Sequence, residues 1–327
     1  MSEVPKSIQR IERFALRAVR KVAFPRGVPP KNLPTVSGPE LNDYIRTSLL
    51  SEAPFMVARF GSIELSAGLY SYLSSLSLPA RYKLYVQKRI DWLHPSAKYA
   101  ESLIKPLCNN AGFFPENVDL LEKYSTLVRE DIKALDCCCC CWGQENLWMK
   151  EYDKNVRFAN LGDLEPYDYA HPWSKSLEGK KVLVVHPFAE SIQKQYSRRD
   201  LLWENPDVLP SFDLKTLKAV LSLAGEEVPY QDWFEALDSM KQQMDETDYD
   251  IAIIGCGAYG FHLAAHAKRS GKKAVHLGGA TQILFGIKGK RWDELPAVSR
   301  FYNEDWIYPS PEETPQNKGR VEGGCYW

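Results

Sequence analysis

The chain has 327 residues, of which 44% are hydrophobic and 25% are charged, and this composition excludes fibrous and wholly disordered classes. Its 41 basic and 42 acidic side chains nearly cancel. This balance argues against a nucleic-acid-binding protein, because such proteins usually carry a strongly basic face. No apolar run reaches the roughly 20 residues of a membrane span, and the N-terminus lacks a signal-peptide core, so we expect a cytoplasmic protein.

Residues 5–26 predict a basic amphipathic helix. The apolar residues at helical spacing are Ile8, Ile11, Ala15, Ala18 and Val22. Such a helix either attaches to an anionic membrane surface, here the inner face, or packs on its own domain with its basic side in solvent. Residues 27–39 are rich in proline and glycine and predict a linker. We therefore assign residues 1–36 to a separate helix and linker, and residues 37–327 to one domain.

The first half of that domain, residues 37–178, is predicted to be mainly helical around one buried strand. Ser37 and Glu40 have the spacing of a capping box at the start of a helix. Residues 54–60 predict a strand, and residues 63–73 predict a helix. Residues 81–136 have a helical pattern that is interrupted near residues 108–118, where Asn, Gly and Pro cluster.

Five of the eight cysteines are consecutive, from Cys137 to Cys141. Secreted disulfide frameworks space their cysteines along the chain, so we expect reduced thiols. The run predicts a strand or a buried turn in which cysteine packs as a small hydrophobic residue. Cys137 and Cys140 form a Cys-x-x-Cys pair, but no second pair lies at zinc-ribbon spacing. Metal or redox chemistry is the alternative to packing.

The second half, residues 179–327, alternates strand and helix patterns. The predicted strands are 180–188, 248–254 and 272–279, and the predicted helices are 214–226, 233–245 and 261–271. Strands that alternate with helices of this length predict parallel pairing with right-handed crossovers. We therefore expect an α/β fold with a Rossmann-like parallel sheet flanked by helices, preceded by a helical N-terminal region.

Gly255, Gly257 and Gly260 match G-x-G-x-x-G between a strand and a helix. An NAD-binding version needs an acidic residue at the end of the next strand, and residues 274–279 carry none. The turn, with Tyr259, still suits a phosphate or a sugar because it exposes N–H groups at a helix start. A structural glycine turn is the alternative.

A basic loop follows the last predicted strand. Lys288, Lys290 and Arg291 stand near Gly286 and Gly289, and three cations on such a loop can neutralise a diphosphate. A solvated charged loop is the alternative interpretation.

Histidines offer two further candidates. His186 ends a predicted strand, where α/β sheets bind ligands, and it is a candidate general base. His262 and His266 lie four residues apart on one predicted helix, but no third zinc ligand accompanies them. Packed or surface histidines are therefore the favoured interpretation of that pair.

The segment ARFGSIE, residues 58–64, resembles the R-[FY]-G-D-x-E signature of the GT-D-fold glycosyltransferases (domain of unknown function 1792). The similarity continues through NNAGFF, VLVVHPF, IIGCGAYG, HLGGATQILFGIKGKRW and EGGCYW, and so covers roughly residues 50–327. The resemblance implies a bacterial enzyme that moves a sugar from a nucleotide-sugar donor, a UDP-sugar by expectation, to a glycan or lipid-linked acceptor. It implies a role in surface-polysaccharide or glycoprotein assembly. It leaves the oligomeric state open.

The resemblance places Glu64 at the donor diphosphate and its metal ion, but Ser62 stands where the family has aspartate. Three interpretations remain. Glu64 holds Mn²⁺ or Mg²⁺ together with the diphosphate and waters; or the basic loop and Arg59 replace the metal; or the chain is a non-catalytic binding or scaffold protein. The predicted catalytic residues are Arg59, Ser62, Glu64 and His186. The predicted donor-binding residues are Gly61, Gly255, Gly257, Tyr259, Gly260, Gly278, Gly279, Gln282, Lys288, Lys290 and Arg291.

Overall fold

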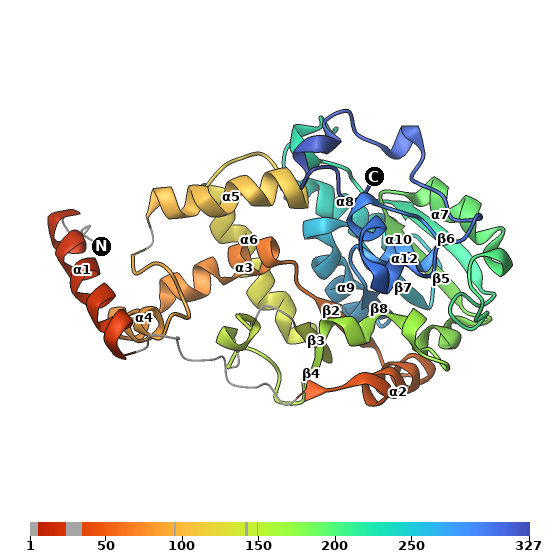
Figure 1. Cartoon of the computed structure of the whole chain (residues 1–327), viewed down its shortest axis with the longest axis horizontal. Helices are drawn as coiled ribbons and strands as arrows, with labels where there is room; N and C mark the ends of the chain where they lie inside the picture. Colours follow the sequence, from red (N-terminus) through yellow and green to blue (C-terminus); the bar gives the residue numbers. More distant parts are fainter. Residues whose placement is uncertain (1–5, 24–34, 95, 141–142, 149) are drawn as a thin grey trace.

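The computed structural model describes residues 6–23, 35–94, 96–140, 143–148 and 150–327, and at 6–13, 35 and 224 it describes the backbone alone (Figure 1). Most of the predicted linker and Cys141 lie outside the described residues. Among the described residues, no helix combines the length and the apolarity needed to cross a bilayer.

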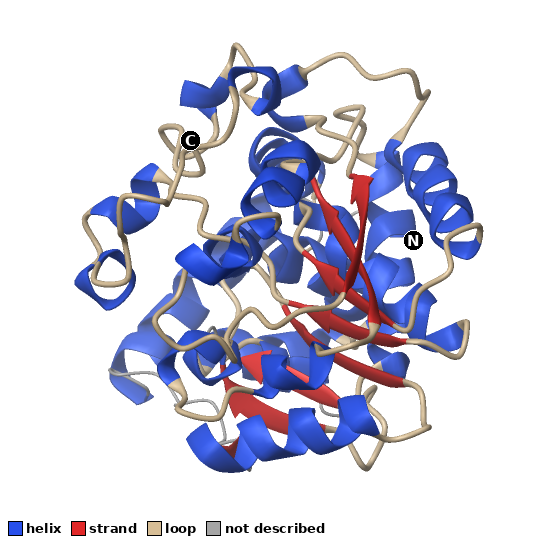
Figure 2. Ribbon diagram, turned by 90° about the vertical axis from the view of Figure 1, so that its right-hand side faces the viewer, coloured by secondary structure: helices blue, strands red, loops and turns tan. Residues whose placement is uncertain are grey.

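An eight-stranded, all-parallel sheet forms the centre of the molecule, in the order β1-β4-β3-β2-β8-β7-β5-β6 (Figure 2). The strands are β1 (Thr35–Val36), β2 (Phe55–Arg59), β3 (Cys137–Cys140), β4 (Arg157–Asn160), β5 (Lys181–His186), β6 (Asp213–Lys218), β7 (Ile251–Ile254) and β8 (Lys273–His276). The pairing of β2 with β8 joins the two halves of the chain in this one sheet. The predicted class, a Rossmann-like parallel sheet flanked by helices, is confirmed.

Helices cover both faces of the sheet (Figure 2). They are α1 (Lys6–Ala23), α2 (Gly38–Leu50), α3 (Ser62–Ser75), α4 (Leu78–Val86), α5 (Ala97–Ala111), α6 (Asp119–Asp131), α7 (Ala189–Tyr196), α8 (Trp233–Asp245), α9 (Gly260–Arg269), α10 (Ala280–Leu284), α11 (Lys290–Asp293) and α12 (Pro296–Ser299). Side chains of β2 alternate between two buried cores, with Met56 and Ala58 on one side and Phe55 and Val57 on the other. This alternation buries both faces, as a parallel sheet requires.

A helical lobe of α3, α5 and α6 stands beside the sheet, with α4 and α1 at its far end (Figure 1). The Ser125 hydroxyl on α6 donates to the Gly68 carbonyl oxygen on α3 at 2.6 Å, which ties two of these helices together. Because α3 follows β2 directly, the lobe is anchored at the carboxyl edge of the sheet.

Helix α1 contacts α4 through a different face from the one that the sequence predicts. Arg20 lies 4.8 Å above the ring of Tyr85 and forms an ion pair with Asp91 at 2.8 Å. Ala18 and Val22, which belong to the predicted apolar stripe, are exposed to solvent.

The helix predicted over residues 214–226 is wrong. Strand β6 occupies the first part of this segment and pairs with β5 along its whole length, and a short 3₁₀ turn follows at 223–225. Leu214, Leu217 and Leu221 do recur at helical spacing. The edge of β5 decides the outcome. Pairing with β6 satisfies backbone N–H and C=O groups along that edge of β5, and these groups would lack a partner if residues 213–218 formed a helix.

The capping box predicted at Ser37 is also wrong. Ser37 does precede α2, but its side chain makes no capping hydrogen bond. The Asp163 carboxylate instead accepts from the backbone N–H of Gly38 at 3.0 Å. Asp163, 125 positions away, thus satisfies one free N–H group at the start of α2, while the Ser37 carbonyl oxygen accepts from the N–H of Glu40 at 3.1 Å.

The cysteine run forms β3, in the middle of one side of the sheet. Cys137, Cys138 and Cys139 are buried in the two cores, so the interpretation as packing residues agrees with the structure. Hydrogen bonding to Cys140 and burial raise the pKa of the Cys138 thiol well above its ordinary value. Such thiols pack as inert hydrophobic groups rather than as nucleophiles.

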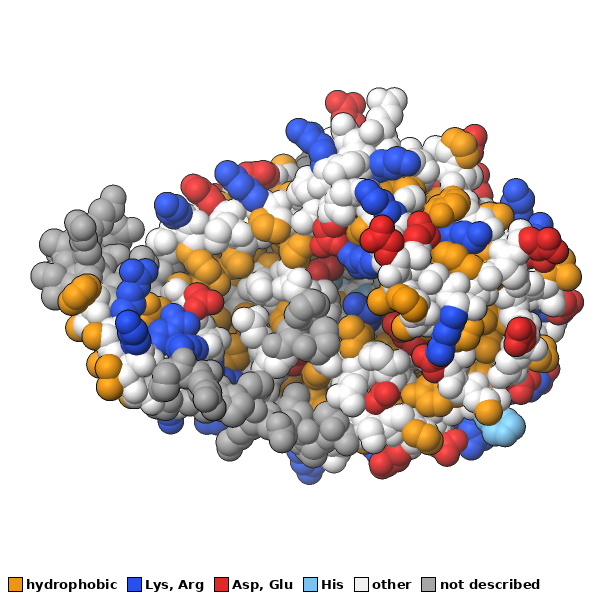
Figure 3. Space-filling view, in the orientation of Figure 1, with side chains coloured by type: hydrophobic (Ala, Val, Ile, Leu, Met, Phe, Trp, Pro, Cys, Tyr) orange, Lys and Arg blue, Asp and Glu red, His pale blue; other side chains and the backbone are white. Residues whose placement is uncertain are grey.

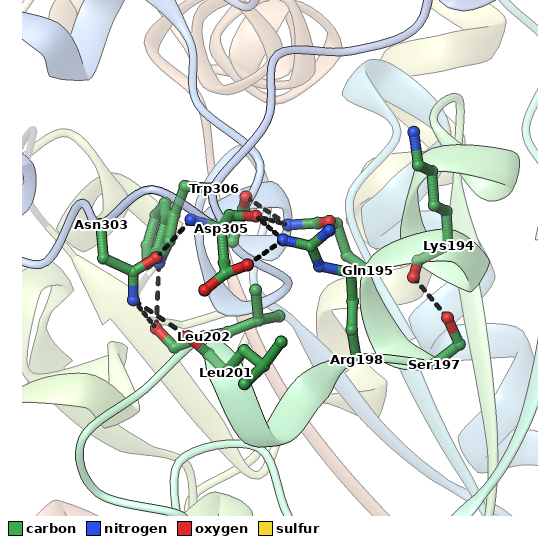
Figure 4. A network of polar contacts seen from close by, with 10 residues as sticks. Lys194, Gln195, Ser197, Arg198, Leu201, Leu202, Asn303, Asp305 and Trp306 are labelled. Carbon is green, nitrogen blue, oxygen red and sulfur yellow. Dashed lines mark hydrogen bonds and ion pairs between the residues drawn. The ribbon is translucent and has the colours of Figure 1, made fainter.

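The C-terminal segment is fixed to α7 and the turn after it by a polar network (Figure 4). Gln195 donates to the Asp305 carbonyl oxygen at 3.0 Å, and Arg198 forms an ion pair with the Asp305 carboxylate. The indole N–H of Trp306 donates to the Leu202 carbonyl oxygen at 2.9 Å. This network holds the chain between the basic loop and the C-terminus against α7 and the turn after it.

Candidate active site

Residues from four strands meet at one edge of the sheet. Arg59, His186 and His276 end β2, β5 and β8, and Gly255 follows β7. Because all strands run parallel, their carboxyl ends share this edge, which is where open α/β sheets bind ligands. In the space-filling view, acidic and basic side chains gather around a hollow in the middle of the face that the reader sees (Figure 3).

Two adjoining cavities lie at this edge. The first, called here the apolar chamber, includes His186, Phe188, Leu221, Leu223 and Trp327 in its wall. The second is called the charged chamber. Its wall includes Arg59, Glu64, Glu165, Arg291 and Glu322. The residues that line both chambers are Glu64, Asn110, Ala111, Gly257, Gly279 and Tyr326.

Glu64 lies at the junction of the chambers, in the first turn of α3. Its carboxylate folds back over Gly61, into the space that a Cβ atom at that position would fill. The side chain is half-buried, reached from the cleft but surrounded by protein. Burial raises the pKa of Glu64 above its ordinary value, and the nearby Glu322 carboxylate adds to the rise. A hydrogen bond from its own backbone N–H and the positive charges of Arg59 and Arg291 oppose that rise.

Arg59 reaches the charged chamber along Gly278. An added Cβ at Gly278 would lie 3.3 Å from Cδ of Arg59, and Gly278 has a φ of +62°, in the region that favours glycine. The Arg59 charge acts on Glu64, Glu165 and His276. The guanidinium therefore stands among the acidic groups of this chamber.

The predicted basic loop sends its three cations to different places. Arg291 lines the charged chamber, where it forms an ion pair with Glu322 and lies 4.9 Å from the centre of the Tyr326 ring. The Lys288 ammonium lies 5.3 Å above the ring of Tyr302, outside the lining of both chambers. Lys290 donates to the Gly323 carbonyl oxygen at 3.3 Å and is also outside both linings.

At each of the three motif glycines, a neighbouring carbonyl oxygen or ring lies so close that a side chain would not fit. A Cβ at Gly255 would collide with the Gly278 carbonyl oxygen, and one at Gly260 with the ring of His276. A Cβ at Gly257, where φ is +56°, would lie 2.6 Å from the Ala111 carbonyl oxygen. Gly255 and Gly257 nevertheless line the cleft, whereas Gly260 does not.

Tyr259 and Gln282 are both part of the apolar chamber. The Tyr259 ring stacks on Trp233 at 5.1 Å, and its hydroxyl lies 3.2 Å from that of Ser222. The side-chain amide of Gln282 donates to the carbonyl oxygens of Lys288 and Tyr326, at 3.0 and 3.2 Å. Gln282 thus fixes both the basic loop and the C-terminal residues at the cleft.

His186 is neutral near pH 7 because burial lowers its pKa to about 3. Its Nδ1 accepts a hydrogen bond from the backbone N–H of Phe188 at 3.0 Å. The remaining proton is therefore on Nε2, and the ring is suited to donate a hydrogen bond in the apolar chamber. A general base near pH 7 needs a higher pKa, so this geometry disfavours that role for His186.

The zinc alternative for His262 and His266 is not supported. His262 Nδ1 lies 2.6 Å from the Asp131 carboxylate, and His266 Nε2 lies 2.8 Å from that of Asp245. Within the described part of the chain, no group of three or more His, Cys, Asp or Glu side chains is placed to hold a metal ion.

Five residues of the cleft were not singled out from the sequence. They are Asn110, Glu165, His276, Glu322 and Tyr326. Asn110 and the last two lie in the NNAGFF and EGGCYW blocks, and His276 begins the HLGGATQ block, so the similarity to the family motifs was the available signal. Glu165 lies in a segment without such a signal.

No family model matches the sequence, and a search of curated proteins gives no match. Among solved structures, the chain is similar to one described as a selenomethionine-substituted structure of domain of unknown function 1792. The TM-score is 0.39 and the identity is 13%, over 92% of this chain and 96% of that chain. This is the same domain family whose sequence signature the segment from Arg59 to Glu64 resembles.

Proposed function

We propose that the protein is a glycosyltransferase that uses a nucleotide-sugar donor. The observation that carries the proposal is the position of Glu64, a carboxylate with a raised pKa between an apolar chamber and a chamber containing two arginines. An apolar chamber suits a nucleoside, and guanidinium groups suit a diphosphate. The donor sugar would then lie beside Glu64.

In the proposed reaction, an acceptor hydroxyl oxygen forms a bond to the anomeric carbon of the donor sugar. The bond from that carbon to the diphosphate oxygen breaks, and the hydroxyl proton passes to the Glu64 carboxylate. Arg59 and Arg291 stabilise the negative charge that develops on the departing diphosphate. The raised pKa of Glu64 suits a general base because it brings proton affinity closer to the working pH.

The finer assignments rest on the resemblance of the motifs. They are a UDP-sugar as donor, a glycan or lipid-linked acceptor, and a place in bacterial surface-polysaccharide or glycoprotein assembly. In this proposal the acceptor would enter through the charged chamber.

The test is sugar transfer and donor hydrolysis with UDP-, GDP- and CMP-sugars, comparing the natural protein with Glu64→Gln. We expect Glu64→Gln to lower kcat by about 10²–10⁴-fold, the usual contribution of a general base, and to change donor affinity only a few-fold. Glu122→Gln, on the exposed side of α6, is the matched control and should leave kcat unchanged. Equal turnover by the natural protein and Glu64→Gln would show that Glu64 has another role.

A nucleotide-sugar-binding protein without catalysis is the second candidate function, and Ser62 in place of the family aspartate favours it. Donor binding without transfer or hydrolysis across the panel would select this alternative. An NAD-dependent oxidoreductase is less well supported, because β8 ends at His276 and Leu277 follows it, where a dinucleotide site needs a carboxylate. Stabilisation by NAD alone would favour the oxidoreductase.

We further propose that α1 attaches the protein to an anionic membrane. Phe14 and Val22 are 79% and 82% exposed, and the cations Arg17 and Lys21 are exposed on the same helix. A basic helix with exposed apolar side chains fits an anionic lipid surface. Phe14→Ser with Val22→Ser should weaken flotation with anionic vesicles and leave nucleotide binding unchanged. Equal flotation of the variant would exclude this role.

A further inference from the structure

We propose that the donor diphosphate binds to Arg59 and Arg291 without a divalent metal ion, and that Glu322 is the counter-ion which the diphosphate displaces from Arg291. This inference rests on the proposed function, because it concerns the same cleft. It departs from what the resemblance implies, which is a Mn²⁺ or Mg²⁺ ion held by an Asp-x-Glu motif.

The carboxylates of the charged chamber do not form a metal site. Ser62 occupies the aspartate position and offers only a neutral hydroxyl. The Glu165 carboxylate accepts a hydrogen bond from the Tyr167 hydroxyl at 2.6 Å, and the Glu322 carboxylate is paired with Arg291. Of these carboxylates, Glu64 alone stands at a position of the Asp-x-Glu motif.

Charge also disfavours a divalent cation beside Glu64. Arg59 and Arg291 line the same chamber as Glu64, and both guanidinium groups act on its carboxylate, so Glu64 already has two positive neighbours. Arginine stays charged at all physiological pH values and can bind phosphate oxygens through two parallel N–H groups. The two side chains therefore supply the charge that a metal ion would supply.

Arg291 is held in place by contacts that do not involve Glu322, so its guanidinium can exchange one anion for another without moving. Its backbone N–H donates to the Cys325 carbonyl oxygen at 2.9 Å, and its guanidinium lies over the ring of Tyr326. The partner, Glu322, is 40% exposed at its side chain and lies at the surface of the C-terminal turn. A phosphate that takes the place of the Glu322 carboxylate leaves the Arg291 backbone and ring contacts intact.

The experiment is calorimetric titration of UDP, with uridine as the probe without phosphates, in EDTA and in Mn²⁺. We expect the Kd for UDP to agree within about threefold between the two buffers. Arg291→Gln should weaken UDP binding at least tenfold and leave uridine binding unchanged. Glu322→Gln should strengthen UDP binding several-fold, because the competing anion is removed. Glu190→Gln, which breaks the surface pair with Lys218, is the matched control and should have no effect.

A second variant tests the metal directly. Ser62→Asp recreates the Asp-x-Glu motif, and we expect it to weaken UDP binding in EDTA and to restore that binding in Mn²⁺. UDP binding by the natural protein only in Mn²⁺, or unchanged binding by Arg291→Gln, would overturn the inference while leaving the proposed function in place. Failure of UDP, GDP and CMP to bind in either buffer would overturn both.

Discussion

The position of Glu64 depends on the absence of a side chain three residues earlier. Gly61 precedes α3, and the Glu64 carboxylate occupies the space where a Cβ would project. The helix start also favours a negative charge there, because the first N–H groups of a helix carry partial positive charge. Gly61 and the start of α3 thus fix the carboxylate at the junction of the two chambers.

We expect Gly61→Ala to lower kcat by about 10–100-fold, because the added methyl group forces the Glu64 carboxylate out of place. Gly162→Ala is the control, since a Cβ there meets nothing within 4 Å. Steady-state kinetics and a thermal melt separate an effect on catalysis from an effect on stability. The activity should fall while the melting temperature changes little. An active Gly61→Ala variant would show that the exact position of the carboxylate does not matter.

The charges around Glu64 predict the pH dependence of the proposed reaction. As general base Glu64 must be ionised, so kcat/KM, which reports the free enzyme, should fall with decreasing pH, with its midpoint above 4.5 because the pKa of Glu64 is raised. Glu322→Gln removes a negative neighbour and should move this midpoint to lower pH. Arg291→Gln removes a positive neighbour and should move it to higher pH. A profile of kcat/KM against pH for the three proteins checks these signs; shifts in the same direction would contradict the arrangement.

At the scale of elements, α8 supports the cleft from behind. Its first residue, Trp233, is fully buried and stacks on Tyr259 of the apolar chamber. The Asp232 carboxylate caps this helix by accepting from the N–H groups of Phe234 and Glu235, at 2.8 and 2.9 Å. The cap therefore orients a residue that supports the chamber wall.

Asp232→Ala should lower the free energy of unfolding by about 0.5–2 kcal/mol, the usual effect of losing an N-cap side chain. Asp232→Asn should retain most of the stability, because its carbonyl oxygen can accept the same bonds. Urea denaturation measures both values. Asp238→Ala on the exposed side of α8 is the control, since its surface pair with Lys241 contributes little. Equal losses for Asp232→Ala and Asp238→Ala would argue against the cap.

The whole molecule carries buried neutral histidines at the carboxyl edge of its sheet. Burial lowers the pKa of His186 and of His276 to about 3, from an ordinary 6.5. Their neutral forms stabilise the fold above pH 6.5. This stability is lost as the pH falls from 6.5 towards 3, because the unfolded chain then binds protons that the folded chain excludes.

Each of these histidines should lower the unfolding free energy by up to about 1.4 kcal/mol per pH unit below 6.5, or about 2 kcal/mol between pH 7 and pH 5. Urea denaturation at the two pH values tests this. His186→Asn should reduce the difference in unfolding free energy between the two pH values by the contribution of one histidine. His171→Asn, at an exposed position, should leave that difference unchanged. An unchanged pH dependence in His186→Asn would show that this histidine does not titrate between the two states.

Much of the fold could be predicted because it is encoded locally. The pattern of residues 233–245 predicts α8 with the bounds that the structure has, and the apolar runs before Gly61 and Gly255 predict β2 and β7. The prediction over residues 214–226 failed because the spacing of leucines is compatible with a helix, while the partner that makes β6 a strand is β5, about 30 residues away in the chain. The division into halves at residue 178 stays a prediction.

For the site, the sequence alone determined which residue types stand at the ends of the strands: Arg59 and Glu64 around a glycine, His186 after an apolar run, and a glycine turn at 255–260. Only the tertiary structure decided that Arg291 lines the charged chamber while Lys288 and Lys290 lie elsewhere, and that Glu322 is the partner of Arg291. The physical reason is that local sequence sets backbone conformation and burial over a few residues. Which side chains share a cleft instead depends on how the C-terminal segment folds back across the carboxyl edge of the sheet.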